Sequence, residues 1–304
     1  MKKLGHLAIA GMVLCWSAYY LLSAWGVEFT GSPYLTGMLL RSAALIFLTI
    51  FMVAKGAFKQ LFAVKKALVP LILVGLLGFA LDTFANIGFM YGSVATGTML
   101  LKTDVLMVNL VAVIVFKEKI TPKEWVFALI MFAGVLCVLD IDFKSMTFNF
   151  YDLFFILSAM AVTANAFLIK GVQKKFEVSN EVIAYYNNFV VLIAFTLASF
   201  ISADIFTMSA NTYDAGVILL ILAGGLAQTG IYVFYYRNLR VYPVWLVKVF
   251  LLIMPIITAI VSVFAFGTTI STIQIVGMAV VTLGALGIIL SQRNKHEGGQ
   301  HVRN

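Results

Sequence analysis

Charged residues are scarce in this chain of 304 residues: Asp, Glu, Lys and Arg make up 11%, hydrophobic residues make up 62%, and the mean hydropathy is +1.03. A water-soluble domain of this length must cover its surface with polar side chains, so the composition excludes a soluble protein. Ten spans of about 20 residues would account for the apolar residues. The sequence therefore predicts an all-α, multi-pass integral protein of the cell membrane, the cytoplasmic membrane if the source is a bacterium.

Cysteine and histidine are also rare. Cys15 and Cys137 lie in apolar runs, and His6, His296 and His301 lie near the two ends of the chain. These positions exclude a disulfide framework, a zinc site and a histidine proton relay within the spans. Motifs such as HExxH, GxSxG and the P-loop are missing from the sequence. We therefore expect no enzyme chemistry, no ATP use, no metal and no cofactor.

Hydropathy predicts ten transmembrane helices. The N-terminal run begins with basic residues, as a signal peptide does, but it lacks a clear small-residue cleavage site, so we interpret it as a retained first helix. The predicted spans are 7–26, 34–53, 68–90, 95–116, 123–139, 150–169, 182–200, 215–236, 242–266 and 272–291.

Basic residues are distributed asymmetrically between the connections. Most of the 21 Lys and Arg residues fall on one side, and Lys144 is the only one on the other. The positive-inside rule makes the basic side cytoplasmic, which places both termini in the cytoplasm and requires an even number of spans. This distribution also explains the net charge of +8 without a nucleic-acid partner.

The two halves of the chain resemble each other at a shift of 150 residues. Phe116 then aligns with Phe266 and Gly134 with Gly284, in matching span–turn–span segments. Because each half holds five spans, an odd number, the halves enter the membrane from opposite sides as inverted repeats. We predict a first repeat at 1–145, a second at 146–292 and a polar cytoplasmic tail at 293–304.

Two segments carry a resemblance to a known family. VFKEKITPKEWVFALIMFAGVLCVL, with Glu118 and Gly134, and MLLRSAALIFL, with Arg41, are similar to EamA-type proteins of the drug/metabolite transporter superfamily. The second half departs from the pattern, since Thr268 stands where the first half has Glu118. The resemblance implies a ten-helix carrier whose cavity is lined by spans 1, 3, 4, 6, 8 and 9, with spans 5 and 10 at the periphery.

Five ionisable residues lie well inside predicted spans: Arg41, Asp82, Lys102, Asp104 and Lys248. Each would cost roughly 2.5–3.5 kcal/mol if it faced lipid at the centre of a helix, so all five must face protein or water. At 1.5 Å per residue, the first four lie about 10–13 Å below the outer ends of their spans. They therefore share one layer of the membrane.

Helical geometry predicts roles for four of them. Lys102 and Asp104 lie on opposite faces of one span, so we assign Lys102 to a cavity and pair Asp104 with Arg41 as a structural ion pair. Asp82 shares a face with Asn86 and is a candidate for binding or proton coupling, unless Lys102 holds it ionised.

Lys248 and the aromatic residues complete the predicted site. The side chain of Lys248 either extends to the cytoplasmic surface or approaches the midplane opposite Lys102, where the two lysines would attract an anion. Further polar and aromatic candidates lie on the helices that the resemblance assigns to the cavity: Trp16, Tyr20, Asn165, Gln228 and Tyr232.

These residues predict a secondary or facilitative carrier that works by alternating access. The leading substrate is an amino acid or a similar charged metabolite, bound by Lys102, Lys248 and Asp82. The alternative is a quaternary ammonium (choline-like) or aromatic cationic compound, held by aromatic rings with Asp82 as counter-ion. The sequence allows a coupling proton or ion, and a homodimer, as further partners.

Overall fold

The computed structural model describes residues 3–91, 94–141, 150–207, 214–266 and 269–301, and within them the chain forms only helices and their connections. Lys144 and Thr268 lie outside the described residues. The α-helices are α1 (Lys3–Thr30), α2 (Pro33–Ala54), α3 (Leu68–Tyr91), α4 (Val94–Lys102), α5 (Asp104–Ile114), α6 (Pro122–Val138), α7 (Asp152–Lys175), α8 (Asn180–Ile201), α9 (Ala215–Val241), α10 (Val244–Phe250), α11 (Met254–Phe266) and α12 (Thr272–His301). Short 3-10 turns are η1 (Phe58–Ala63), η2 (Lys65–Ala67), η3 (Asp204–Thr207) and η5 (Leu251–Ile253).

Eight helical stretches in the described residues are long and apolar enough to cross a membrane. The two remaining predicted spans, 95–116 and 123–139, correspond to α4 with α5, of 9 and 11 residues, and to α6, of 17 residues. The multi-pass helical fold is thus confirmed, and the total of ten spans stays a prediction. Residues 293–301, predicted as part of a polar tail, continue α12.

The fourth and ninth predicted spans are each interrupted near the middle. Thr103 separates α4 from α5, and its hydroxyl donates to the carbonyl oxygen of Leu100 at 2.6 Å. The turn η5 separates α10 from α11, next to Pro255, which has no backbone N–H to give to the helix. At the shift of 150 residues these interruptions coincide, so the two halves share an interrupted helix at the same place.

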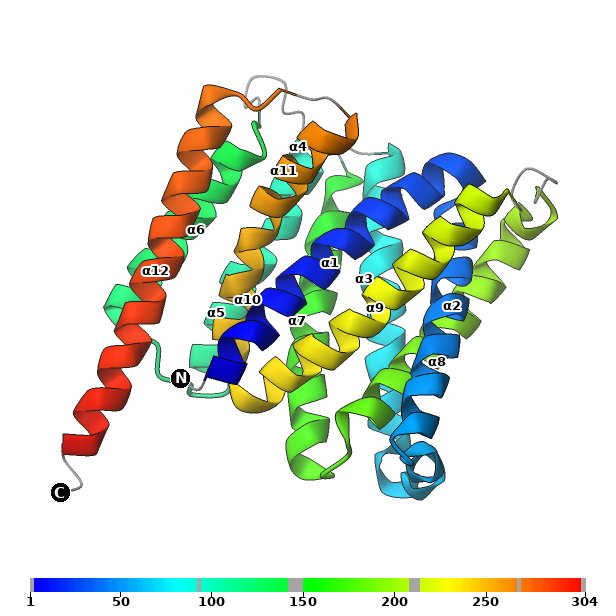
Figure 1. Cartoon of the computed structure of the whole chain (residues 1–304), viewed down its shortest axis with the longest axis horizontal. Helices are drawn as coiled ribbons and strands as arrows, with labels where there is room; N and C mark the ends of the chain where they lie inside the picture. The colour runs from blue at the N-terminus through cyan, green and yellow to red at the C-terminus, as the bar shows by residue number, and fades with distance from the viewer. Residues whose placement is uncertain (1–2, 92–93, 142–149, 208–213, 267–268, 302–304) are drawn as a thin grey trace.

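Packing between the halves is reciprocal. In the two halves, α1 corresponds to α7, α2 to α8 and α3 to α9. The packing of α1 on α9 then matches the packing of α7 on α3. In the same way, the packing of α2 on α9 matches the packing of α8 on α3. Figure 1 shows that α1 and α7 run in opposite directions along the molecule. Both observations agree with an inverted repeat.

Helices α6 and α12 pack against each other at one edge of the molecule (Figure 1). Their backbones approach closely, because a Cβ atom on Gly277 would lie 2.7 Å from the carbonyl oxygen of Gly134. Small residues permit this contact in apolar surroundings, where helices gain stability from close packing. The peripheral position that the resemblance implies for spans 5 and 10 is therefore confirmed.

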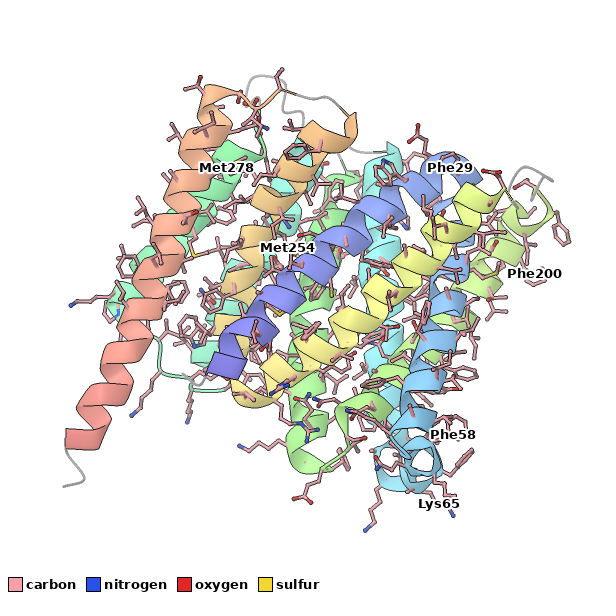
Figure 2. All side chains as sticks on the ribbon, in the orientation of Figure 1. Phe29, Phe58, Lys65, Phe200, Met254 and Met278 are labelled. Atoms are coloured by element: carbon pink, nitrogen blue, oxygen red, sulfur yellow. The ribbon has the colours of Figure 1, made fainter. Side chains whose placement is uncertain are left out.

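The two ends of the molecule differ in charge. Figure 2 places Phe29 at one end and Phe58 and Lys65 at the other. The second end, which we call the basic end, holds the lysine-rich connections α2–α3 and α5–α6 and the end of α7 with Lys174 and Lys175. It also holds the start of α1 and the end of α12 (Figure 1). The opposite end holds η3 with Asp204.

We expect the basic end to face the cytoplasm. In a variant without Cys15 and Cys137, a cysteine at exposed Thr207 should react with a membrane-impermeant maleimide added outside intact cells, and a cysteine at Lys59 should react only after lysis. The reverse pattern of labelling would contradict the predicted orientation.

Candidate functional site

Two ion pairs form inside the apolar helices, and neither is the predicted one. Arg41 Nη2 lies 3.1 Å from Asp82 Oδ2, and Lys248 Nζ lies 3.2 Å from Asp104 Oδ2. The predicted pair of Arg41 with Asp104 is therefore wrong. Depth along each helix predicted that these charges share one layer, but their pairing depends on which helices are neighbours. Asp104 meets Lys248 because α5 packs on α10.

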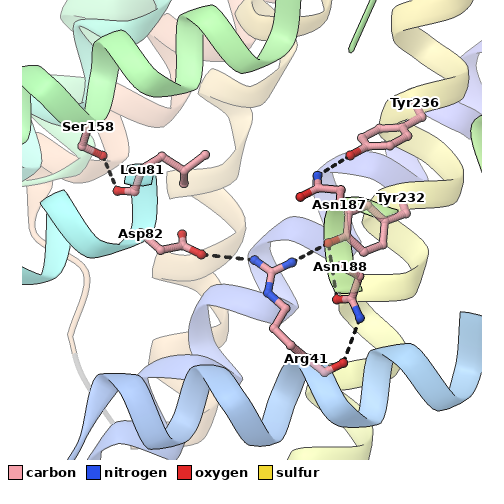
Figure 3. Close-up of polar contacts among 8 residues, drawn as sticks. All are labelled: Arg41, Leu81, Asp82, Ser158, Asn187, Asn188, Tyr232 and Tyr236. Atoms are coloured by element: carbon pink, nitrogen blue, oxygen red, sulfur yellow. Dashed lines mark hydrogen bonds and ion pairs between the residues drawn. The ribbon is translucent and has the colours of Figure 1, made fainter. Parts of the chain in front are cut away.

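Arg41 is the centre of a hydrogen-bonded network that joins the two halves (Figure 3). Its Nη1 donates to the hydroxyl of Tyr232 at 2.5 Å, and Asn188 Nδ2 donates to the backbone carbonyl of Arg41 at 2.9 Å. The hydroxyl of Tyr232 also donates to Asn188 Oδ1 at 3.4 Å. Tyr19 packs its ring 5.6 Å from the guanidinium carbon. Arg41 is only 6% exposed, so these contacts replace water around its charge.

Lys248 is held between aromatic rings. Its ammonium lies 5.6 Å from the ring centroid of Trp16 and 5.8 Å from that of Tyr235, and these two rings meet edge to face at 4.8 Å. The residue is 2% exposed, so the side chain does not extend to the surface. Of the two predictions for Lys248, the structure supports the buried position.

Of the five ionisable residues inside the predicted spans, Lys102 is the one that forms no ion pair with a described residue. It is the last residue of α4 and lies within electrostatic range of Asp104 and Lys248. Asp104 begins α5, and Lys248 lies in the last turn of α10, so both charges complement the dipoles of their short helices. Two cations and one acid therefore gather at the interruptions of the two matching spans.

Tyr20 is near the acids of both ion pairs. It is within electrostatic range of both Asp82 and Asp104, yet 48% of its surface is exposed. Asp82 and Asp104 also keep part of their side chains exposed, at 23% and 16%. The described residues therefore do not fully enclose the two ion pairs.

The remaining predicted residues divide into two groups. Gln228 hydrogen bonds to Tyr232, and Asn165 lies with Asn187 beside Gly78 of α3, so both belong to the buried polar surroundings. Asn86 of α3 is partly buried, and it belongs to neither ion pair. Asn187 and Asn188 were not predicted as members of the site, although two adjacent amides in the apolar segment 182–200 are a sequence signal for buried polar contacts.

Glu118 lies outside this cluster, in the α5–α6 connection. It accepts a hydrogen bond from the backbone N–H of Val244, and Lys170 Nζ lies 3.8 Å from its Oε1. Lys170 also donates to the carbonyl oxygen of Tyr242 at 2.7 Å. Burial raises the pKa of Glu118, against the opposing attraction of Lys170. Glu118 therefore links the first half of the chain to the start of α10 in the second.

Comparison with known proteins agrees with this architecture. The model of the EamA-like transporter family matches residues 3–140 and again residues 149–290. No curated protein is matched by the sequence. One protein of known crystal structure shares 18% sequence identity with this chain. The match covers 96% of this chain and 100% of that protein's chain, and its TM-score of 0.76 shows that the two share a fold. The chain therefore belongs to the EamA-like transporter family, within the drug/metabolite transporter superfamily, and is a multi-pass membrane transporter of small solutes.

Proposed function

We propose that the protein carries a small zwitterionic or anionic organic solute, with an amino acid as the leading candidate. The observation that carries this proposal is the balance of charge in the buried cluster. Arg41 is offset by Asp82 and Lys248 by Asp104, and Lys102 remains without an ion pair to any described residue. One excess positive charge in apolar surroundings favours the binding of a carboxylate.

The acids and the aromatic residues offer contacts for the rest of such a solute. Each ion pair uses Oδ2 of its acid, so Oδ1 of Asp82 or Asp104 is available to a substrate amine. Tyr20, which is within electrostatic range of both acids, presents a partly exposed ring. A zwitterion with an apolar side chain would thus find an opposite charge for each of its charged groups.

A quaternary ammonium substrate fits this arrangement less well. The faces of Trp16 and Tyr235 already contact the ammonium group of Lys248. A quaternary ammonium group has no N–H to donate to the carboxylate oxygens of Asp82 or Asp104, and it would have to displace Lys248 to reach the two rings. A quaternary ammonium compound stays the alternative substrate, and the uptake assay described below tests it.

The ion pair of Lys248 with Asp104 supports a route for alternating access. It joins α10 of the second half to α5 of the first, beside the interruptions of both spans. Rocking of one half against the other would separate the two residues, and a substrate carboxylate could take the place of Asp104 beside Lys248. The rings of Trp16 and Tyr235 would keep the ammonium group in position during this exchange.

Lys102→Met should leave the protein folded and weaken substrate binding. Loss of one charge-assisted hydrogen bond corresponds to about 1.5–3 kcal/mol, roughly a 10- to 150-fold higher Kd. Uptake into proteoliposomes, measured for a panel of amino acids and for choline-like cations, would test this. Lys123→Met is a matched control, because Lys123 is exposed at the start of α6. Uptake of cations but not of amino acids by the unmodified protein would reject the amino-acid proposal.

A further inference from the structure

A groove lies at the basic end between α3 and the last turns of α7, away from the charged cluster. Its volume is about 650 Å³, and its walls are mainly apolar. They are formed by Pro70 of α3, Val172 of α7 and Phe176, which is the C-cap of α7. Gly171 leaves the groove open, because a Cβ atom built on this residue would meet no other atom within 4 Å. The opening is notable because α3 and α7 otherwise pack against each other along their lengths.

Two lysines line this groove, and two more precede α3 in the chain. Lys174 and Lys175 line it, and the exposed Lys65 and Lys66 lie in η2, immediately before α3. None of the four forms an ion pair with a described residue. Glu177 is the one acid next to the groove along α7, so the surroundings keep an excess of positive charge.

We propose that this groove binds an anionic phospholipid of the cytoplasmic leaflet. One acyl chain would lie over Gly171 against the partly exposed Leu168 and Phe176, and the phosphate would lie beside Lys174 and Lys175. The apolar walls distinguish a lipid from a soluble anion, because a free phosphate gains nothing from them. The lysines distinguish an anionic from a neutral headgroup, since basic pockets between helices on the cytoplasmic side are suited to acidic lipids. This site is independent of the proposed transport substrate.

The test is lipid binding to the full chain in detergent, followed by native mass spectrometry. Delipidated protein is titrated with phosphatidylglycerol and with phosphatidylcholine of identical acyl chains. We expect phosphatidylglycerol to be retained preferentially, and the double substitution Lys174→Ala with Lys175→Ala to weaken its binding by roughly tenfold or more. Gly171→Phe, which fills the groove and keeps every charge, should weaken binding of the same lipid.

A matched control removes two lysines elsewhere at the same end. Lys119→Ala with Lys123→Ala, at exposed positions before α6 and in its first turn, should leave lipid retention unchanged. An equal loss in this control would reject a specific site in favour of general surface charge. Equal retention of both lipids by the unmodified protein would also overturn the proposal. Displacement of the lipid by millimolar inorganic phosphate would identify the site as one for soluble anions instead.

Discussion

Arg41→Ala is expected to destabilise the protein by about 3–5 kcal/mol, because it leaves Asp82 without the guanidinium that pairs with it in apolar surroundings. The same change removes the donor to the hydroxyl of Tyr232. Adding Asp82→Asn should recover part of the loss, since the unpaired charge is then gone. The free energy of unfolding in mixed micelles of sodium dodecyl sulfate and a mild detergent would measure both effects.

A double-mutant cycle that combines Arg41→Ala with Asp104→Asn is the control for this prediction. Asp104 pairs with Lys248, so Asp104→Asn should add its own loss to that of Arg41→Ala without recovery. A coupling energy of about 0.5–3 kcal/mol is expected for the Arg41–Asp82 cycle, and a value near zero for the other. The opposite result would mean that Arg41 pairs with Asp104 in the membrane.

Gly277→Val should separate α6 from α12. Its new Cβ atom would lie 2.7 Å from the carbonyl oxygen of Gly134 and 2.7 Å from the backbone nitrogen of Val138, and backbone atoms cannot move aside as a side chain can. Overpacking of this kind costs about 1–3 kcal/mol, and more where the backbone must shift. Thermal unfolding in detergent, together with the fraction of monodisperse protein after size-exclusion chromatography, would measure the loss.

Gly171→Val is the matched control for this substitution. It introduces the same side chain into a helix at a position where nothing lies within 4 Å of the new Cβ atom. Its unfolding temperature should stay close to that of the unmodified protein. Equal losses in the two variants would show that helix propensity, and not contact with α6, sets the cost.

The sequence predicted the helices well, because their apolar lengths are set by the bilayer. The span predicted at 34–53, for example, corresponds to α2 at Pro33–Ala54. The interruptions at Thr103 and η5 were not predicted. A turn at Thr103 leaves the hydropathy of its segment unchanged, and a single proline such as Pro255 is tolerated in transmembrane helices.

The need of the buried charges for partners was predicted from the sequence, but their pairings were not. Burial cost identified Arg41, Asp82, Asp104 and Lys248 as residues that must meet a partner, and the structure brings them into two ion pairs. Which residue meets which depends on contacts such as that of α5 with α10, and one sequence without those contacts does not define the neighbours. Asn188 was not predicted, because burial of an uncharged amide costs much less than burial of a charge and is therefore a weaker signal for a required partner.

The two ion pairs also differ in when they can form during synthesis. Arg41 and Asp82 are separated by 41 residues and both lie in the first half, so the ribosome completes this pair early. Asp104 precedes Lys248 by 144 residues, which at about 5–20 residues per second is a delay of roughly 7–30 seconds. Until then the nearest cation in the chain is Lys102. The residue assigned here to the substrate is thus also the first counter-charge that Asp104 meets in the nascent protein.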